Sequence, residues 1–263
     1  MGAAVRGTAL VTGGARRLGR AMVLELARQG HDVAIHYAGS AKAAEDTADE
    51  AQALGVRAQV FQADLLDADA AAALVPRVAE AMGPLTVLVN NASIFEHDTI
   101  RSATMAGWDR HLGSNLRAPF QLIQAFAAQA PNAVPDENGE PQAQALVVNM
   151  VDQRVLKPTP EFMTYSLAKA ALWSLTRTAA QGLAPDIRVN AIGPGPTLIG
   201  TRQSADHFAA QRAATVLGRG SDPQGISQAL AYLLDARAVT GQLICVDGGQ
   251  HLAWRTPDML ERG

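Results

Sequence analysis

Short runs of apolar and β-branched residues alternate along the chain with alanine-rich segments of helical length. Most of the apolar runs lack the polar alternation of a half-exposed strand, which is typical of strands covered by helices on both faces. The repeat of strand, helix and strand predicts an α/β fold with a parallel sheet. The expected strands are residues 8–12, 32–37, 57–63, 85–89, 145–151, 187–193 and 242–246.

The segments between these strands carry the helical pattern. Leu18, Met22 and Leu26 recur at i, i+4 and predict one apolar stripe on the first helix, and Gly30 stands where a C-terminal cap belongs. The prolines, glycine and acids of 131–142 predict a solvated loop, and 194–222 forms a long irregular segment directly after a strand. Further helices are expected at about 41–54, 67–81, 105–130, 161–183 and 223–235.

The composition suits one globular domain. The chain has 263 residues, 48% hydrophobic and 18% charged, and its net charge of −3 comes from interspersed acids and bases. We therefore expect neither a nucleic acid nor a membrane surface as a partner. Cys245 is the single cysteine, so no internal disulfide is possible and a reducing, cytoplasmic location is expected. The sequence has no apolar run of the roughly 18 residues that a membrane span needs, and we do not expect its first residues to act as a signal.

The segment TGGARRLG, residues 12–19, follows the first expected strand and opens the first expected helix. Free backbone N–H groups and the positive end of that helix would face a ligand above the turn. The spacing differs from the common G-x-G-x-x-G fingerprint, so tight packing of the turn is the other interpretation. The segment predicts a binding site for an anion.

The segment HYAGS, which follows the second expected strand, bears on the choice of cofactor. An NAD-binding protein usually carries an acid here to hold the ribose 2′-hydroxyl, and HYAGS has none. Ser40, with Arg16 or Arg17 nearby, offers donors that suit a 2′-phosphate. NADPH is therefore the favoured cofactor, with an ordinary polar turn as the other interpretation.

Tyr165 and Lys169 stand four residues apart in YSLAK, on one face of an expected helix. A phenol has a pKa of about 10, and a nearby ammonium group favours the phenolate, which brings the pKa closer to a useful range for proton transfer. Such pairs also arise by chance. The pair gains weight from NNAS (90–93) and PGPT (194–197), which end two strands at the rim where open parallel sheets bind ligands.

Together, TGGARRLG, NNAS, YSLAK and PGPT, with Asp64 and Asn115, resemble the short-chain dehydrogenase/reductase family over essentially the whole chain. The resemblance implies one Rossmann-like, doubly wound α/β domain over residues 1–263, with a seven-stranded parallel sheet flanked by helices. It implies that Tyr165 is the catalytic acid, that Lys169 holds the nicotinamide ribose and that Asn115 supports a proton relay. The residues that it implies at the cofactor are Gly13, Arg16, Arg17, Leu18, Tyr37, Ser40, Asp64, Leu65, Asn91, Ala92, Ser93, Tyr165, Lys169, Pro194, Gly195 and Thr197.

Asp152, at the end of ALVVNMV, departs from the pattern of that family. Most members carry a serine or threonine at this distance before the tyrosine, and its hydroxyl donates to a substrate carbonyl. An ionised carboxylate cannot donate and would repel a forming oxyanion, so Asp152 better suits reduction of a C=N bond, whose nitrogen needs a full proton. We expect Asp152 to raise the pKa of Tyr165, against Lys169, so that the two acids titrate as a pair. The other interpretations are a helix N-cap or an ion pair with Arg154.

Four local features resemble the pteridine reductases and dihydromonapterin reductases within the family. Arg17 stands where most members have glycine or alanine, Asp152 lies thirteen residues before Tyr165, Phe95 follows NNAS, and a DGG segment lies near the C-terminal end. The resemblance implies that Phe95 stacks on a pterin and that Arg17, Ser93, Asp152 and Tyr165 also contact the substrate. Packing of Phe95 beneath its own loop is the other interpretation.

These features predict an NADPH-dependent reductase of a pterin C=N bond, which converts a dihydropterin such as dihydrobiopterin, dihydromonapterin or dihydrofolate to the tetrahydropterin. We expect a homotetramer and a substrate loop at 194–222. The alternatives are a carbonyl reductase of the same family, acting on a 3-oxoacyl or sugar substrate, and a non-catalytic NADP-sensing protein. We expect no metal site, because none of the histidines has metal-ligand spacing with carboxylates: His31, His36, His97, His111, His207 and His251.

Overall fold

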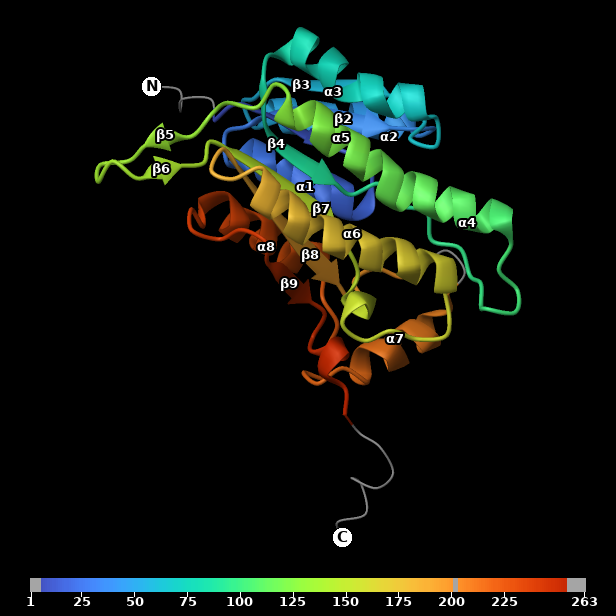
Figure 1. Cartoon of the computed structure of the whole chain (residues 1–263). Helices are drawn as coiled ribbons and strands as arrows, with labels where there is room; N and C mark the ends of the chain where they lie inside the picture. Colours follow the sequence, from blue (N-terminus) through green and yellow to red (C-terminus); the bar gives the residue numbers. More distant parts are fainter. Residues whose placement is uncertain (1–5, 201–202, 255–263) are drawn as a thin grey trace.

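Seven parallel strands form the central sheet of the computed structural model, which describes residues 6–200 and 203–254 (Figure 1). Their order is β3-β2-β1-β4-β7-β8-β9. The ends of all seven lie within one residue of those expected from the apolar runs. The strands are β1 (Thr8–Val11), β2 (Asp32–Tyr37), β3 (Ala58–Gln62), β4 (Leu85–Asn90), β7 (Ala145–Met150), β8 (Ile187–Pro194) and β9 (Leu243–Val246).

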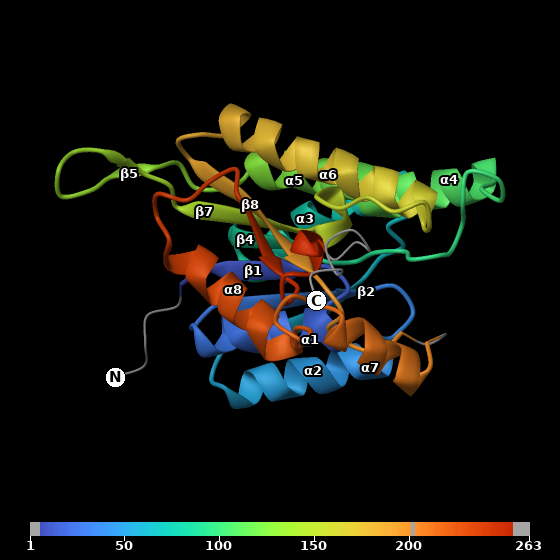
Figure 2. The same ribbon diagram turned by 90° about the horizontal axis from the view of Figure 1, so that it is seen from below.

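Helices cover both faces of the sheet, which makes the fold a doubly wound Rossmann-like domain (Figure 2). One face packs on α1 (Arg17–Arg28), α2 (Ala41–Ala53) and α8 (Pro223–Asp235), and the other packs on α3 (Ala68–Met82), α5 (Ala118–Ala127) and α6 (Met163–Gly182). The central strands β1 and β7 are buried along their whole length. This burial on both faces explains why their sequences read as continuous apolar runs.

The predicted stripe on the first helix is confirmed in α1. Met22 and Leu26 are fully buried, and Leu18 packs against the same core. Gly30 follows the helix with a φ of 85° and donates its N–H to Ala27 O at 3.0 Å. A residue without a Cβ adopts this left-handed conformation without strain, so Gly30 ends the helix as its position predicts.

The expected helix over 105–130 is wrong as a continuous α-helix. The segment contains α4 (Met105–Leu112), a π-helical turn η1 (Gly113–Arg117) and α5, which ends at Ala127. The apolar periodicity runs through the break because a π-turn adds a residue without ending the helix. The extra residue rotates the side chains after Gly113, and Asn115 lies within this turn.

Two segments expected to be irregular contain short elements. The loop 131–142 carries a small hairpin of β5 (Val134–Pro135) and β6 (Pro141–Gln142). The segment 194–222 contains α7 (Ala205–Ala213), which buries none of its residues, while residues 201 and 202 lie outside the described chain. Because α7 packs no apolar stripe, its sequence lacks the periodicity that predicts a helix. No helix in the described residues is long and apolar enough to span a bilayer.

The topology brings the predicted motifs to one rim of the sheet. The chain builds outward from β1 to β2 and β3, then crosses to β4 on the other side of β1. A crevice forms at such a switch point, outside the carboxyl ends of the strands. TGGARRLG follows β1 and NNAS follows β4, so these two segments meet there.

Candidate active site

The turn after β1 packs directly against the start of α1. Gly13 has a φ of 61°, and a Cβ built on Gly19 would lie 2.1 Å from Gly13 O, so a side chain there would push the helix away. Within the described chain, the N-cap residue Arg16 makes no side-chain cap to α1, and the first turn of the helix carries no acid. The N–H groups and the positive helix end remain available to an anion, so this cradle fits a dinucleotide phosphate.

Buried polar groups hold this turn in place. Gly13 N donates to His36 Nδ1 at 3.0 Å, and His36 Nε2 donates to Ala63 O at 3.1 Å. Burial lowers the pKa of His36, which favours the neutral ring that accepts from Gly13. Thr12 Oγ1 accepts from the N–H groups of Asn91 and Ala92 at 2.9 and 3.0 Å. Sequence reasoning missed His36 and Thr12, although a histidine inside the apolar run DVAIHY was a visible signal.

Asn91, predicted at the cofactor, links the two segments of the crevice. Its Nδ2 donates to Thr12 O at 2.8 Å and to Gly13 O at 3.2 Å. The side chain therefore fixes NNAS against the glycine-rich turn. Asn91 thus shapes the cradle from the β4 side.

The other predicted cofactor residues lie along the same rim. Asp64 Oδ1 accepts from Leu66 N at 2.9 Å and so shapes the turn after β3, while Leu65 is buried. Thr197 Oγ1 donates to Gly195 O at 3.0 Å, and a Cβ on Gly195 would lie 2.5 Å from that of Asp247. At strand or helix ends of the rim lie Arg16, Leu18, Tyr37, Ser40, Ala92, Ser93 and Pro194.

Arg17 links the glycine-rich turn to the expected substrate loop. Its Nη1 and Nη2 donate to Ile199 O at 3.0 Å and to Leu198 O at 3.2 Å. Its φ of 53° is left-handed, a conformation that glycine adopts without strain. This explains why a glycine would fit the position, and the arginine instead ties the turn to residues 198 and 199.

Tyr165 and Asp152 are in direct contact. Tyr165 Oη donates to Asp152 Oδ2 at 2.9 Å. Asp152 Oδ1 accepts from Arg154 N at 2.9 Å, and Arg154 Nη1 lies 3.3 Å from Oδ2, so the carboxylate also caps the short η2 turn (Gln153–Val155) and forms an ion pair. The N-cap and the ion pair with Arg154 are therefore both confirmed, and the same carboxylate also accepts from Tyr165. Burial, then the negative charge of Asp152 and its hydrogen bond, raise the pKa of Tyr165 well above 10.

Lys169 lies one helical turn beyond Tyr165 on α6. Its Nζ donates to Met150 O at 2.7 Å and lies 5.7 Å from the centroid of the Tyr165 ring. Burial lowers the pKa of Lys169 to about 8, while the charge of Asp152 opposes this shift. The lowering of the Tyr165 pKa that the i, i+4 spacing suggested is wrong, because burial and Asp152 raise that pKa.

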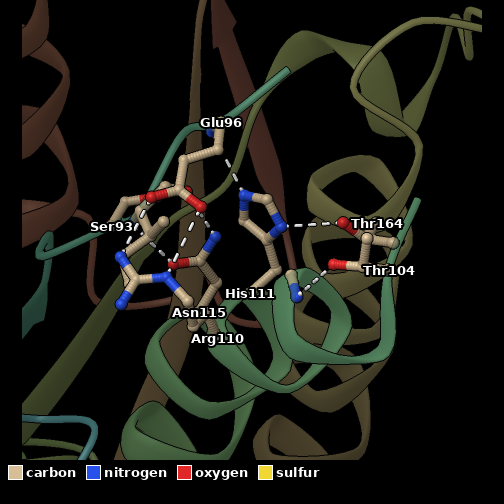
Figure 3. Close-up of polar contacts among 9 residues, drawn as sticks. Ser93, Glu96, Thr104, Arg110, His111, Asn115 and Thr164 are labelled. Atoms are coloured by element: carbon tan, nitrogen blue, oxygen red, sulfur yellow. Dashed lines mark hydrogen bonds and ion pairs between the residues drawn. The ribbon is translucent and has the colours of Figure 1, made fainter. Parts of the chain in front are cut away.

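Asn115 is fully buried in the π-turn η1. Its Oδ1 accepts from Ile94 N and its Nδ2 donates to Ile94 O, both at 2.9 Å (Figure 3). The amide thus satisfies both backbone groups of a residue beyond β4, as a neighbouring strand would. In this structure Asn115 fixes the segment that carries Ser93 and Phe95.

Phe95 does not pack beneath its own loop, because 52% of the residue is exposed. Its ring stacks on that of Phe162, with centroids 4.2 Å apart and an interplanar angle of 8°. The rings of Phe95 and Tyr165 meet edge to face, with centroids 4.7 Å apart. Arg154 Cζ lies 5.7 Å from the centroid of Phe95 and 5.2 Å from that of Phe162. Sequence reasoning missed Phe162 and the cation–π role of Arg154, since neither forms a recognisable spacing.

Tyr165 and Asp152 form a hydrogen-bonded pair of acids at the carboxyl ends of the strands. Burial and Asp152 raise the pKa of Tyr165, which favours the protonated phenol, and its hydrogen bond runs to a carboxylate. Asp152, when ionised, supplies no hydrogen-bond donor to a carbonyl oxygen. In the described residues, no group of three or more His, Cys, Asp or Glu side chains could hold a metal ion.

Comparisons with known proteins agree with this fold and cradle. Residues 13–251 match the family model described as enoyl-(acyl carrier protein) reductase. The 3-oxoacyl-[acyl-carrier-protein] reductase FabG of Staphylococcus aureus is 33% identical over 250 residues, which cover 93% of this chain and 98% of that protein.

Two solved structures are similar over almost their whole length. FolM alternative dihydrofolate reductase 1 from Brucella suis, in complex with NADP, is 44% identical, with a TM-score of 0.89 and coverage of 97% of this chain and 99% of that chain. FolM alternative dihydrofolate reductase 1 from Brucella canis, complexed with NADP, is also 44% identical, with a TM-score of 0.88 and 96% coverage of each chain.

Proposed function

The chain belongs to the short-chain dehydrogenase/reductase family, and we propose that it is an NADPH-dependent reductase of a pterin ring. The bond reduced is a C=N bond of a dihydropterin such as dihydrobiopterin, dihydromonapterin or dihydrofolate. The observation that carries the proposal is the 2.9 Å hydrogen bond from Tyr165 Oη to the carboxylate of Asp152, at the position where most of the family donates from a hydroxyl. The names of the two FolM structures support the same substrate class.

The cofactor proposal is supported by the cradle at the switch point. The open N-terminus of α1 and the turn at Gly13 suit the pyrophosphate. Arg16 is exposed, the segment HYAGS lacks an acid, and Ser40 is the N-cap of α2, so Arg16 and Ser40 would hold a 2′-phosphate. The NADP in both FolM complexes agrees with this choice. When bound, NADPH supplies the hydride.

The residues of the chain supply the proton. Reduction of C=N to CH–NH consumes one hydride and one proton, and the proton is held at Tyr165 Oη, directed toward Asp152 Oδ2. Asp152 shares this proton and passes it on, directly or through water. Lys169 supplies a positive charge beside the phenol ring, and Asn115 holds the segment that walls the site.

The raised pKa of Tyr165 suits reduction better than oxidation. Alcohol or amine oxidation in this geometry needs a phenolate to accept the substrate proton. Burial and the charge of Asp152 raise the pKa of Tyr165, so the phenol enters the reaction with its proton in place and Lys169 is left to stabilise the phenolate that forms. Arg17, Ser93 and Phe95 orient the heterocycle, with Phe95 offering a flat ring to stack on.

A second candidate is reduction of a 3-oxoacyl carbonyl, which the name of the FabG relative favours. The carbonyl oxygen would then face Asp152, whose two oxygens already accept from Arg154 N, Arg154 Nη1 and Tyr165. A developing oxyanion would meet a negative charge there. The residue geometry therefore favours the pterin.

The test is a substrate panel on three variants at one position. NADPH oxidation is followed with dihydrobiopterin, dihydromonapterin, dihydrofolate, a 3-oxoacyl thioester and a simple ketone. Asp152→Ala and Asp152→Asn should lower pterin turnover by about 100-fold or more, because a positioned acid contributes this much. Asp152→Ser restores the hydroxyl common in the family and should raise carbonyl turnover relative to pterin turnover.

Glu137→Ala, which removes an exposed carboxylate from the β5–β6 hairpin, is the matched control and should retain full activity. Unchanged pterin turnover in Asp152→Ala would remove Asp152 from the mechanism. Wild-type turnover of the thioester without turnover of any pterin would favour the second candidate.

The proposal extends to a cytoplasmic homotetramer, as the family resemblance implies. Sedimentation equilibrium of the purified chain tests the assembly state. A mass about four times that of one chain is the expected result, and a monomer at micromolar concentration would contradict it.

A further inference from the structure

A buried hydrogen-bond chain runs beside Tyr165 through three segments that are distant in sequence. Glu96 N donates to His111 Nε2 at 3.2 Å, and His111 Nδ1 lies 2.7 Å from Thr164 Oγ1 (Figure 3). Thr164 Oγ1 in turn donates to Asp98 Oδ2, and Thr164 N donates to Asp98 Oδ1 at 3.2 Å. His111, Thr164 and Asp98 are 1%, 2% and 8% exposed, so water does not compete for these bonds.

The direction of every bond in this chain is fixed by its first donor. A backbone N–H can only donate, so His111 Nε2 must accept, and the ring proton must lie on Nδ1. His111 Nδ1 therefore donates to Thr164 Oγ1, which leaves the threonine hydroxyl hydrogen for Asp98. The chain ends on a carboxylate that faces the N-terminus of α6, where a negative charge is favoured.

These bonds connect the wall of the site to its catalytic helix. Glu96 directly follows Phe95, and Thr164 directly precedes Tyr165. His111 lies in the last turn of α4, two residues before the π-turn that contains Asn115. The His111 ring also lies 6.2 Å from that of Tyr165, edge to face. One imidazole thus sets where the Phe95 segment lies relative to the phenol.

We propose that His111 is a positioning residue, whose Nε2 acceptor holds the Phe95 segment in register with Tyr165 for a planar ring substrate. This inference rests on the proposed function for the identity of that substrate. His111 itself touches no reacting atom. Its effect is expected on substrate affinity through Phe95, with little effect on the proton-transfer step.

Two amide variants separate the two ring nitrogens. An asparagine amide lies near the place of Nδ1, so His111→Asn keeps the donor to Thr164 and loses the acceptor for Glu96 N. A glutamine amide reaches the place of Nε2, so His111→Gln keeps that acceptor. His111→Asn should raise KM for the dihydropterin about 5-fold with kcat changed less than 2-fold, as expected for one lost hydrogen bond, while His111→Gln stays near wild type.

Arg110→Ala is the matched control, because Arg110 lies on the same helix and pairs with the side chain of Glu96 at 2.9 Å on the surface. An exposed ion pair contributes little, so its loss should leave KM unchanged. Thr104→Ala removes the cap of α4, where Thr104 Oγ1 accepts from Gly107 N at 3.1 Å, without touching the chain of bonds. It should lower the melting temperature but not raise KM.

Equal KM values in His111→Asn and His111→Gln would overturn the inference, and so would an increase in Arg110→Ala as large as that in His111→Asn. If His111 only stabilises the fold, both His111 variants should have lower thermal stability or a smaller active fraction, and their KM should stay unchanged.

Amide hydrogen exchange of the peptide over 92–98 gives a readout that does not depend on the substrate. Exchange should be faster in His111→Asn and unchanged in His111→Gln. If the wild type reduces carbonyl compounds and no pterin, the proposed function fails, and exchange still decides whether His111 holds this segment. Unaltered exchange in His111→Asn would end the inference even in an active pterin reductase.

Discussion

The carboxylate of Asp152 accepts three hydrogen bonds and also interacts electrostatically with Lys169. Its oxygens accept from the backbone and side chain of Arg154 and from Tyr165. The same negative charge raises the pKa of Tyr165 and opposes the lowering of the Lys169 pKa by burial. A single substitution at this residue therefore changes the pKa values of Tyr165 and Lys169.

A pH profile of Asp152→Asn tests this coupling. Lys169 is charged below its pKa of about 8 and loses its charge as the pH rises through that value. The kcat/KM for NADPH, which reports groups of the free enzyme, should therefore fall above about pH 8 in the wild type. Removing the charge of Asp152 removes what raises the Lys169 pKa, so the fall should begin at a lower pH in Asp152→Asn. An unshifted alkaline limb, measured between pH 6 and 10, would show that the two groups are independent.

Phe95 gives a second prediction at this scale. Replacing it with leucine keeps an apolar side chain and removes the flat ring, so the KM for a dihydropterin should rise roughly 2- to 10-fold, the range expected for one aromatic stacking contact. The KM for NADPH should not change. If steady-state kinetics give equal pterin KM values for Phe95→Leu and wild type, the ring does not stack on the substrate.

Site residues that recur at a helical spacing in the sequence were predictable. Site residues that the tertiary fold brings together from distant segments were not. Tyr165 and Lys169 share a helix face, and their proximity follows from four residues of separation. Phe162 reaches Phe95 from a segment more than sixty residues away, with a φ of 56° that no local sequence rule favours for a bulky side chain. His36 and His111 looked like isolated histidines until the fold placed a backbone N–H against each of them.

At the scale of elements, the contact between α1 and the turn after β1 depends on a glycine. A methyl group on Gly19 would lie 2.1 Å from Gly13 O, so Gly19→Ala should displace the start of α1 and weaken NADPH binding at least 10-fold. Gly182→Ala, at the end of α6 and outside the cradle, is the control, since nothing lies within 4 Å of its built Cβ and its φ is not left-handed. Fluorescence titration with NADPH measures both variants. Normal binding by Gly19→Ala would mean that the cradle does not require this close approach.

The strands, which are covered on both faces, were predictable to within one residue, whereas the break inside a helical segment was not. The strands gave unmixed apolar runs because both of their faces are covered. The π-turn at Gly113–Arg117 leaves the apolar period almost intact, so the sequence read as one helix. The exposed helix α7 has an N-cap at Ser204, whose hydroxyl accepts from His207 N at 3.2 Å. A capping residue alone does not predict a helix when the segment has no periodic apolar residues.

For the whole molecule, buried histidines tie stability to pH. Burial, and then the charge of Arg6, lower the pKa of His31 to about 4 in the folded chain, against 6.5 for an unperturbed histidine. The unfolded chain therefore binds more protons between these values, and the free energy of unfolding should decrease as the pH falls below 6.5. The loss from His31 is about 2 kcal/mol at pH 5, and His36, whose pKa burial also lowers, acts in the same direction.

Urea unfolding at pH 7.5 and pH 5 measures this dependence. In His31→Gln the titrating group is gone, so the difference between the two pH values should shrink by a similar amount. A variant that loses as much stability as the wild type on acidification would place the dependence on other groups.

The strand order also governs when the cradle comes into being. Thr12 on one side is bonded to Asn91 and Ala92 on the other, about eighty positions further along, and Tyr165 and Asp152 follow later still. Contacts this distant in sequence close late and slowly. An N-terminal fragment that stops before β4 would contain the entire glycine-rich turn and yet lack half of its scaffold. During synthesis, affinity for a dinucleotide should therefore appear only once β4 has joined the sheet. Binding of the dinucleotide would then indicate that this part of the sheet has formed.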